Sequence, residues 1–472
     1  MLVNVTTAGC EFMNNNTNVE TKKKVFRFIS SVVLVVVLAT LFGVMWYLRL
    51  QNLMNANRFE GKGNYVMIAL YMVLSVLVIN TFNGFEFGSA RISILTMSQA
   101  IAVGVVNAME YVIVILMIRI LKHVWRTLGY FAALTLAQAV AVLVITYIST
   151  KLYRRLFPPF SILNIYGDYE NDLVIKMNRR DDKYSIDGEI SCREPHEKIV
   201  EELAKYDAVL INDVPSEIRN DIVKACFAAD KRVYFTPKIA DILIKGSEEV
   251  NLFDTPLYLC KNVGMDGVSA AIKRMGDILI SSIGIILTSP IMLVTAILIH
   301  MYDGGPVFYK QVRCTIGGKE YKIMKFRSMI TDAEKDGKAR LASENDDRIT
   351  PIGHFIRATR IDELPQFFNI LKGEMSLVGP RPERPEIIAE YVKEVPEFAF
   401  RTHVKAGLTG YAQVYGKYNT TSYDKLKLDM IYCEKCSVLL DIQLILMTLR
   451  VIFTKDATEG VAEGETNAKV HK

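Results

Sequence analysis

The sequence predicts a membrane protein built from three parts: a bundle of membrane helices, then an α/β domain, then a mainly α-helical domain. Three observations predict this order. The first third has four apolar stretches of nearly 20 residues each, and the middle alternates short apolar runs with amphipathic helical segments. The last part has a fifth apolar stretch followed by blocks rich in Lys and Arg. The 472 residues are enough for roughly two to four domains.

The charge of the chain is divided unevenly along its length. The net charge of +5 is too small to indicate a nucleic-acid-binding protein by itself. Residues 1–159 hold 14 Lys and Arg against 5 Asp and Glu, whereas residues 160–472 hold 42 against 46, so the net charges are +9 and −4. This split indicates a membrane portion followed by water-soluble domains. Seven cysteines in so long a chain exclude a disulfide-stapled scaffold.

The first part starts with a polar, Asn-rich tail over residues 1–24. It is not a signal peptide, because the apolar run behind it is too long and lacks a small-residue cleavage pattern. Residues 25–155 hold four apolar stretches, each close to the ~20 residues that a helix needs to cross a ~30 Å hydrocarbon core. The flanking basic residues weakly favour a cytoplasmic N-terminus. The stretches lie at residues 29–48, 65–82, 97–117 and 128–148.

Glu110 lies inside the third apolar stretch. An ionisable group at such a depth is a candidate functional residue. The alternative is an inward-facing Glu that is neutral or hydrogen-bonded to a polar neighbour such as Gln138. We favour the alternative, because no second acidic or basic residue lies deep in any of the four stretches.

Residues 160–262 change the pattern and predict a small α/β domain. Apolar runs at 162–167, 208–213 and 233–237 indicate buried strands, and segments with helical periodicity separate them. This alternation predicts a parallel-sheet, Rossmann-like domain. The first strand is followed by GDYEND rather than by GxGxxG, so the glycines that admit a pyrophosphate are absent. A role in assembly or regulation is favoured over dinucleotide binding, and the domain is a candidate homodimer contact.

The fifth apolar stretch, residues 278–301, is long enough to span a membrane but has Ser289 and Pro290 at its middle. Pro removes one helical hydrogen bond and clashes with the preceding turn. Two interpretations fit: a kinked spanning helix, and a re-entrant helix–break–helix hairpin that enters and leaves by the same face. The hairpin keeps the middle and last domains on one side of the membrane, and the sequence favours it slightly.

Blocks dense in Lys and Arg follow this stretch, although the region is not basic overall. The cations alternate with Gly, Pro and aromatic residues, which is typical of ordered turns rather than of a solvated surface. Arg holds phosphate oxygens through two parallel hydrogen bonds, so the pattern predicts a phosphate-handling site. Its candidate cations are Lys325, Arg327, Arg348, Arg357, Arg360 and Arg381.

Asp362 and Glu363 stand before Leu364, Pro365 and a run with helical spacing. Pro is tolerated in the first turn of a helix, so we expect both carboxylates at a helix N-terminus, where exposed amides favour anions and can face a phosphate. Taken alone, such an acidic pair is more often a cap. Among these cations two other roles are open: a carboxylate can attack phosphorus and form an acyl phosphate, and its neighbour can hold Mg²⁺.

At these residues the chain resembles the monotopic bacterial sugar transferases, the polyprenyl-phosphate hexose-1-phosphate or phosphoglycosyl transferases. The resemblance covers residues 273–454 and begins with Lys273, Arg274 and Asp277. The four preceding stretches and the α/β domain resemble the long members of the family, typified by undecaprenyl-phosphate galactose phosphotransferases. The matching blocks are GPVFYKQVR, KFRSM, RIT, IDELPQ, MSLVGPRP, GLTGYAQVYG and LDI.

The resemblance implies an enzyme that starts exopolysaccharide, capsule or O-antigen synthesis. The family takes a nucleotide diphosphate sugar, usually a UDP-sugar, transfers the sugar 1-phosphate to polyprenyl (undecaprenyl) phosphate and releases UMP. It implies that Asp362 is the nucleophile of a covalent phosphosugar intermediate and that Glu363 binds Mg²⁺. The side chains expected to contact phosphates are those of Lys325, Arg327, Arg357 and Arg381.

The resemblance also implies a membrane arrangement. The Ser-Pro helix of the family is re-entrant, which favours a hairpin over residues 277–301 and a catalytic domain, residues 266–455, facing the cytoplasm of a bacterium at its inner membrane. The expected fold is thus a membrane α-helical bundle, a Rossmann-like middle domain and a mainly α catalytic domain with a re-entrant helix. The expected partners are the lipid bilayer, polyprenyl phosphate and a nucleotide sugar, and no nucleic acid. Residues 456–472 are expected to form a flexible tail.

The sequence leaves several alternatives open. The lipid could attack directly while Asp362 only positions the metal, and the chain could be a non-catalytic membrane scaffold or regulator of polysaccharide assembly. The intact DELP, KFRSM and GPRP blocks argue against a scaffold. Thr315 and Ala406 stand where the family usually has Gly and Pro, which affects local loop geometry. The sugar is open, because hexose, N-acetylhexosamine and dideoxy-sugar donors present the same diphosphate.

Overall fold

The computed structural model describes residues 5–53, 62–118, 123–167, 171–252, 254–260, 264–331, 348–416 and 420–452, with side chains from residue 19 to residue 449 of these ranges. The chain divides into two compact units, Met1–Thr236 and Pro237–Lys472. The flexible tail predicted for residues 456–472 lies outside the described residues.

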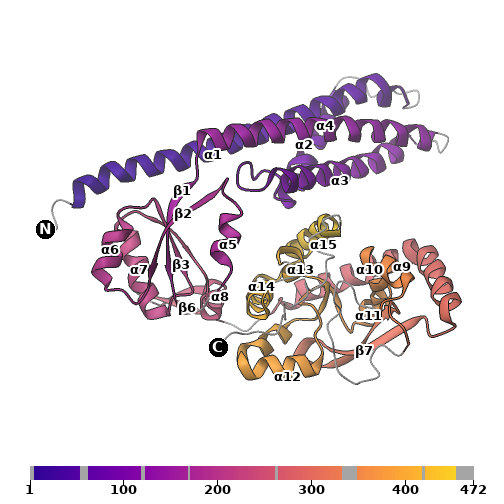
Figure 1. Ribbon diagram of the computed structural model, residues 1–472. Helices are drawn as coiled ribbons and strands as arrows, with labels where there is room; N and C mark the ends of the chain where they lie inside the picture. Colours follow the sequence, from indigo (N-terminus) through magenta and orange to yellow (C-terminus); the bar gives the residue numbers. More distant parts are fainter. Residues whose placement is uncertain are drawn as a thin grey trace. The chain divides into compact units, whose positions relative to one another are not determined.

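The first unit begins with four long apolar helices (Figure 1). Each is long and apolar enough to cross a membrane, which confirms the four predicted stretches as helices. The first helix starts inside the segment predicted as a polar tail. The helices are α1 (Val5–Met45, continued by a π-helical turn, Trp46–Leu50, and a 3-10 turn, Gln51–Leu53), α2 (Lys62–Thr81), α3 (Ile92–Ile118) and α4 (Val124–Leu156).

The outward faces of these helices are apolar, whereas their mutual contacts include polar side chains. Leu116 and Leu136 point outward and are 72% and 71% exposed, as suits side chains that meet lipid. Inside the bundle Gln138 donates hydrogen bonds to the Leu38 carbonyl at 3.0 Å and the Tyr71 hydroxyl at 2.8 Å. Asn107 donates to Gln138 at 2.8 Å. Hydrogen bonds between helices of this kind stabilise a bundle in lipid, where side-chain burial alone does not.

Glu110 is fully buried in this bundle, and neither carboxylate oxygen has a hydrogen-bond partner among the described residues. Glu110 therefore faces inward, as the favoured alternative expects, but the option that it is hydrogen-bonded to a polar neighbour such as Gln138 is wrong. The amide of Gln138 is already used by Leu38, Tyr71 and Asn107, so it does not reach the carboxyl group.

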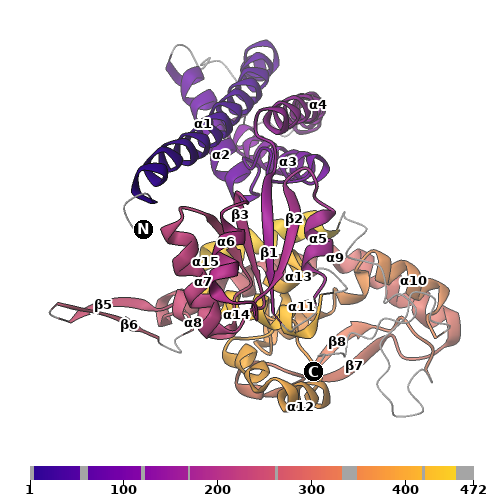
Figure 2. The same cartoon turned by 60° about the vertical axis from the view of Figure 1, so that its left-hand side comes forward.

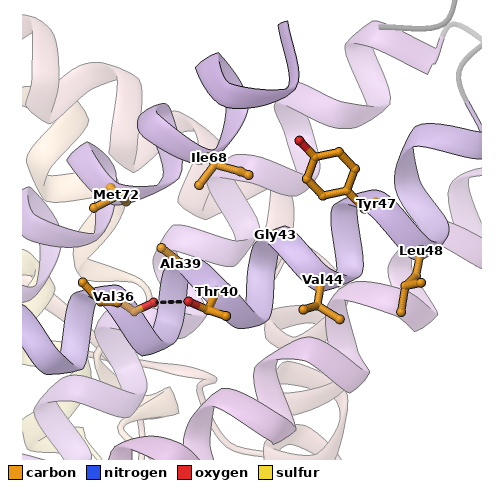
Figure 3. Close-up of a pocket in the computed structure, with 9 residues that line it drawn as sticks. All are labelled: Val36, Ala39, Thr40, Gly43, Val44, Tyr47, Leu48, Ile68 and Met72. Atoms are coloured by element: carbon orange, nitrogen blue, oxygen red, sulfur yellow. Dashed lines mark hydrogen bonds between the residues drawn. The ribbon is translucent and has the colours of Figure 1, made fainter. Parts of the chain in front are cut away.

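An apolar groove of about 530 Å³ lies between α1 and α2 (Figure 3). The Thr40 hydroxyl donates a hydrogen bond to the Val36 carbonyl at 2.8 Å and is thus satisfied within α1. The groove therefore suits hydrocarbon rather than a charged substrate. It is lined by Val36, Ala39, Thr40, Gly43, Val44, Tyr47, Leu48, Ile68 and Met72.

The rest of the first unit is a four-stranded parallel sheet with the order β2-β1-β3-β4. This confirms the predicted parallel α/β domain. The strands are β1 (Phe160–Tyr166), β2 (Tyr184–Ser191), β3 (Ala208–Asn212) and β4 (Arg232–Phe235), and the helices are α5 (Leu173–Asn178), α6 (His196–Leu203) and α7 (Ser216–Ala228).

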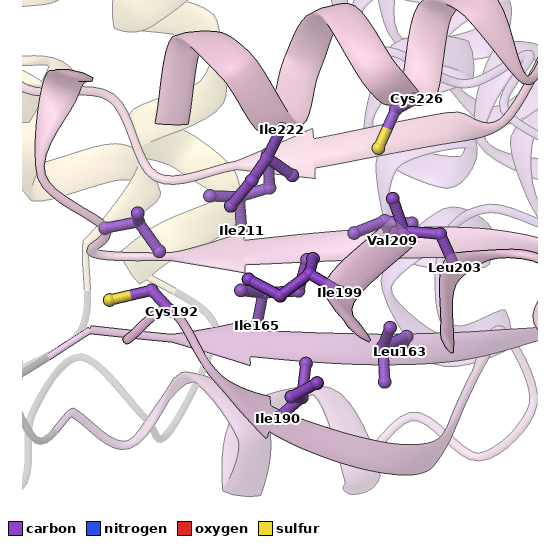
Figure 4. Close-up of a cluster of buried hydrophobic side chains, with 11 residues drawn as sticks. Leu163, Ile165, Ile190, Cys192, Ile199, Leu203, Val209, Ile211, Ile222 and Cys226 are labelled. Atoms are coloured by element: carbon purple, nitrogen blue, oxygen red, sulfur yellow. The ribbon is translucent and has the colours of Figure 1, made fainter. Parts of the chain in front are cut away.

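The larger buried cluster of this domain lies between the sheet and the two helices α6 and α7 (Figure 4), and a smaller one lies between the other face of the sheet and α5. All five residues of β3 are buried, which explains its continuous apolar run. β2 is absent from the sequence prediction, because YSIDGEIS carries Asp187 and Glu189 and buries only Ile190 fully. An edge strand that is half polar has no continuous apolar signal.

Cationic and aromatic side chains join the α/β domain to the bundle within the first unit. Lys23 of α1 lies 3.9 Å from the centre of the Phe160 ring of β1. Arg154 of α4 pairs with Asp182 at 2.6 Å, and Arg180 donates to the Ser89 carbonyl at 3.0 Å. These contacts hold the domain against the ends of α1 and α4.

The second unit is mainly helical with short strand pairs. Its core gathers Ile323, Ile370, Leu377, Tyr432 and Leu444 from five elements. The elements are α8 (Ile239–Lys245), β5 (Glu248–Leu252), β6 (Thr255–Leu259), α9 (Gly267–Asp303), β7 (Phe308–Cys314), a 3-10 turn (Ile316–Gly318), β8 (Glu320–Phe326), α10 (Pro351–Ala358), a 3-10 turn (Ile361–Glu363), α11 (Gln366–Lys372), β9 (Ser376–Val378), α12 (Pro385–Glu394), a 3-10 helix (Pro396–His403), β10 (Gly407–Thr409), α13 (Tyr411–Tyr415), α14 (Ser422–Lys435) and α15 (Val438–Ile452).

The fifth apolar stretch forms α9, which stays helical through Pro290. The helix is therefore not interrupted at Ser289 and Pro290, and the re-entrant course stays a prediction. Pro290 has no N–H for the Ile286 carbonyl, and the Ser289 hydroxyl donates to that carbonyl at 2.8 Å instead. The Ser-Pro pair thus satisfies the one acceptor that the proline leaves without its helical donor.

The start of α9 is tied to the body of the second unit by polar contacts. Lys273 forms an ion pair with Asp441 and donates to the Val378 carbonyl at 3.0 Å. Arg274 donates to the Ile370 and Leu371 carbonyls of α11 at 2.6 and 2.7 Å. Asp277 accepts from Leu377 N at 3.0 Å and from Ser376 Oγ at 3.1 Å. Lys273, Arg274 and Asp277, with which the family resemblance begins, therefore hold α9 against α11, β9 and α15.

Candidate active site

Local backbone geometry sets the direction of the Asp362–Glu363 pair. Thr350 caps α10 by accepting from Gly353 N at 2.9 Å, and the helix ends at Ala358. Arg360 then adopts a left-handed conformation, with φ 58°, which reverses the chain into the 3-10 turn Ile361–Glu363. The carboxylates thus lie in a turn just before α11, not in its first turn. The N–H groups of Glu363 and Leu364 are donated to the Arg360 and Ile361 carbonyls, so cations rather than free amides face the pair.

Three cationic side chains surround one oxygen of Glu363. The Lys325 ammonium of β8 lies 2.8 Å from Glu363 Oε1 and 3.9 Å from Asp362 Oδ2. Arg381 and Arg360 approach the same Oε1 at 3.3 and 3.8 Å. Residues from three separate sequence blocks therefore meet at the acidic pair.

The surroundings push the pKa values of the two carboxyls in opposite directions. Burial alone would raise the pKa of Glu363, but Lys325, then Arg381 and Arg360, together hold it well below its usual range. Burial raises the pKa of Asp362 above its ordinary value; Lys325 opposes this shift, and the charge of Glu363 adds to it. Two neighbouring carboxyls with separated pKa values are suited to different roles in one reaction.

Two of the residues predicted to contact phosphate, Arg357 and Arg327, do not contact the acidic pair as Lys325 and Arg381 do. Arg357, at the end of α10, is close enough for its charge to lower the pKa of Asp362, but its side chain makes no contact with either carboxylate that we observe within the described residues. The guanidinium of Arg327 forms a forked ion pair with Asp303 at the end of α9, with Nη1 2.6 Å from Oδ2. The structure therefore gives Arg327 a partner that holds α9 to β8.

The loop that carries Arg381 follows β9 and packs tightly on the chain at β10. A Cβ atom on Gly407 would lie 2.0 Å from Gly379 N, so the two backbones approach each other more closely than any side chain permits. Gly379 N donates to the Thr409 carbonyl, and Gly407 N donates to the Pro380 carbonyl, both at 2.9 Å. This explains why the GPRP and GLTG blocks belong together: their glycines form one contact.

A metal at this site would have few protein ligands. No group of three or more His, Cys, Asp or Glu side chains placed to hold a metal occurs among the described residues. Mg²⁺ is commonly bound by one or two carboxylates together with substrate phosphates. Asp362 and Glu363 fit that donor set, with Glu363 the better ligand because its lowered pKa keeps it ionised.

Known proteins resemble the part of the chain that carries this site. Residues 268–455 match the family model described as bacterial sugar transferase. A sugar transferase of Bacillus subtilis, itself uncharacterised, is 38% identical over 190 residues, which are 90% of its length and 40% of this chain. This chain belongs to the bacterial sugar transferase family. The acidic pair, Lys325 and Arg381 all lie inside the segment that matches the family model.

Two longer relatives of this chain have named activities. A UDP-N-acetylgalactosamine-undecaprenyl-phosphate N-acetylgalactosaminephosphotransferase of Aeromonas hydrophila is 37% identical over 265 residues, 53% of this chain and 60% of the relative. A UDP-glucose:undecaprenyl-phosphate glucose-1-phosphate transferase of Klebsiella pneumoniae is 37% identical over 248 residues, 52% of this chain and 51% of the relative. The chain thus matches about half the length of these relatives, whose names differ in the sugar and agree on the acceptor.

Proposed function

We propose that this protein transfers a sugar 1-phosphate from a UDP-sugar to polyprenyl phosphate, releasing UMP, as the first membrane step of a surface polysaccharide. The observation that carries the proposal is the buried Asp362 beside Lys325 and Glu363, inside the segment that matches the sugar transferase family. The names of the relatives support the donor and acceptor classes.

In the first step the Asp362 carboxylate attacks the phosphorus that bears the sugar. The bond from this phosphorus to the bridging oxygen breaks, UMP leaves with the electron pair, and Asp362 becomes an acyl phosphate that carries the sugar. Burial removes water from the carboxylate, and the Lys325 ammonium, 3.9 Å from Oδ2, favours its charged form. Lys325 and Arg381 bind the phosphate oxygens whose charge increases as UMP departs.

In the second step an oxygen of polyprenyl phosphate attacks the same phosphorus. The bond to Asp362 breaks, the carboxylate is regenerated, and the product is a polyprenyl-diphosphate sugar. A covalent intermediate allows the water-soluble and the lipid substrate to react one after the other at one set of cations. The same unit holds α9, which is apolar and long enough to enter the bilayer that contains the acceptor.

We further propose that Glu363 is the protein ligand of a Mg²⁺ ion bound with the donor diphosphate. The ion supplies neutralisation of phosphate charge. Glu363 also orients Lys325 and Arg381, since both contact its Oε1 atom. In this proposal the catalytic domain faces the cytoplasm at the inner membrane of a bacterium, with α9 as a re-entrant helix.

The proposal is tested with the purified full chain in nanodiscs that contain undecaprenyl phosphate, supplied with a panel of UDP-sugars and Mg²⁺. We expect UMP release with one or a few of the sugars, and a loss of at least about a thousandfold in Asp362→Asn. A protein that releases no UMP with any donor would support the scaffold alternative. Full activity in Asp362→Asn would show that Asp362 is not the nucleophile.

A further inference from the structure

Every carbonyl oxygen of four consecutive residues in the Arg381 loop accepts a hydrogen bond from outside the loop. Two of the four residues are prolines, whose φ is fixed. Such a loop has little freedom left, and the direction of the Arg381 side chain follows from its main chain. The four bonds are Gly407 N to the Pro380 carbonyl at 2.9 Å, Arg401 Nη2 to the Arg381 carbonyl at 2.9 Å, Arg313 Nη1 to the Pro382 carbonyl at 3.1 Å, and Cys314 N to the Glu383 carbonyl at 3.0 Å.

Two of these donors are guanidinium groups, those of Arg401 and Arg313. The Arg401 side chain is only 7% exposed, and it pairs with the equally buried Asp429 of α14 at 2.7 Å. It also lies over the Phe398 ring, 4.9 Å from the centre. Glu383 lies between the two guanidinium groups, 3.8 Å from Arg401 and 3.6 Å from Arg313. A buried cation is costly unless it is paired and hydrogen-bonded, so these partners indicate that Arg401 is held for a geometric reason.

Arg401 does not touch the acidic pair and can act on it only through Arg381. Its described contacts are with the Arg381 main chain, Glu383, Asp429 and Phe398, and none of these is with the acidic pair. The Arg381 side chain in turn reaches Glu363 at 3.3 Å.

We propose that Arg401 is a positioning residue of the sugar transferase: it fixes the Arg381 main chain, so that the Arg381 guanidinium meets Glu363 and the donor phosphate. The part about the donor phosphate rests on the proposed function. A lysine at position 401 keeps the pair with Asp429 but lacks the planar fork that serves the carboxylate and the carbonyl together.

The kinetic test compares Arg401→Gln, Arg381→Ala and the double variant in the UMP-release assay. We expect each single variant to lose about tenfold to a hundredfold in kcat/KM. The double variant should stay within about threefold of Arg381→Ala, because Arg401 acts through Arg381. Lys393→Gln, which removes a positive charge from an exposed position of α12, is the matched control and should equal the wild type. Multiplied losses in the double variant, or wild-type activity in Arg401→Gln, would overturn the proposal.

A second measurement needs no substrate. Amide hydrogen exchange of Arg401→Gln without ligand should be faster at residues 379–384 and unchanged in α9 and α11. Unchanged exchange in the loop overturns the proposal, and so does faster exchange throughout the second unit, which means a general structural role. If Arg401→Gln does not fold, Arg401→Lys replaces it in both experiments, with smaller losses expected. If the wild type releases no UMP, the proposed function is wrong. The hydrogen-exchange result still decides whether Arg401 holds the Arg381 loop.

Discussion

At the scale of single residues, the site is organised around one oxygen, Glu363 Oε1, which Lys325, Arg381 and Arg360 all approach. Lys325, Arg381 and the acidic pair meet as the blocks predict. Arg327 shares a block with Lys325 yet binds Asp303, because β8 ends at Phe326 and the regular alternation of the strand does not extend to Arg327. Arg401 is missed, since it is a single arginine outside the predicted blocks and reaches Arg381 only through the fold.

The opposed pKa values at the acidic pair lead to a prediction about pH. Asp362 must be ionised to attack, so activity falls as the pH falls through the pKa of this carboxyl. In Lys325→Met the cation that lowers that pKa is gone, and the acidic limb of the kcat/KM profile moves to higher pH. The highest kcat/KM reached in the profile should also fall about a hundredfold, because a phosphate contact is lost.

The matched control for this experiment is Lys322→Met, an exposed lysine on the same strand β8. Its profile should coincide with that of the wild type. An acidic limb that does not move in Lys325→Met, measured with the same donor, would mean that Lys325 does not set the ionisation of Asp362.

At the scale of secondary-structure elements, regular patterns are predicted well and partly polar ones are not. The apolar helices and the buried strand β3 have strong periodic or continuous signals. β2 is missed, and α9 is helical where a break is predicted, because the Ser289 hydroxyl replaces the missing N–H donor. A sequence pattern shows that a donor is absent but not which side chain replaces it.

Variants of the Arg327–Asp303 pair, which joins the end of α9 to the end of β8, test whether Arg327 has a structural role. If its role is structural, Arg327→Gln and Asp303→Asn each lower the unfolding temperature, and the double variant loses little more than either. The donor KM should be unchanged in both. Thermal unfolding in detergent and donor titrations provide these values. A raised donor KM in Arg327→Gln alone would instead support the predicted phosphate contact.

At the scale of the whole molecule, two parts of the chain are long and apolar enough to enter a membrane, the bundle of α1 to α4 and the helix α9. Whether α9 spans the bilayer or is re-entrant decides on which side the elements that follow α9 lie relative to the α/β domain. Exposed basic side chains lie at the bundle ends that join this domain, at Lys22, Lys24, Lys151 and Arg155. They favour the cytoplasm for the α/β domain. The homodimer contact expected of that domain stays a prediction.

Membrane-impermeant maleimide labelling tests this arrangement with Lys224→Cys on α7 and Lys393→Cys on α12, two exposed positions. If α9 is re-entrant, neither cysteine is labelled in intact cells and both are labelled after permeabilisation. The wild type, with its exposed Cys260, gives the background. Labelling of Lys393→Cys but not of Lys224→Cys in intact cells would mean that α9 spans the membrane.

The proposed two-step reaction requires that Asp362 becomes covalently linked to the sugar phosphate before the lipid reacts. Mass spectrometry of the protein after incubation with a UDP-sugar that supports turnover, in the absence of polyprenyl phosphate, tests it most directly. We expect a mass increase of one sugar phosphate on the peptide that contains Asp362, which disappears when polyprenyl phosphate is added and is absent in Asp362→Asn. An unmodified protein that still turns over when both substrates are present would contradict the covalent scheme and support direct attack by the lipid.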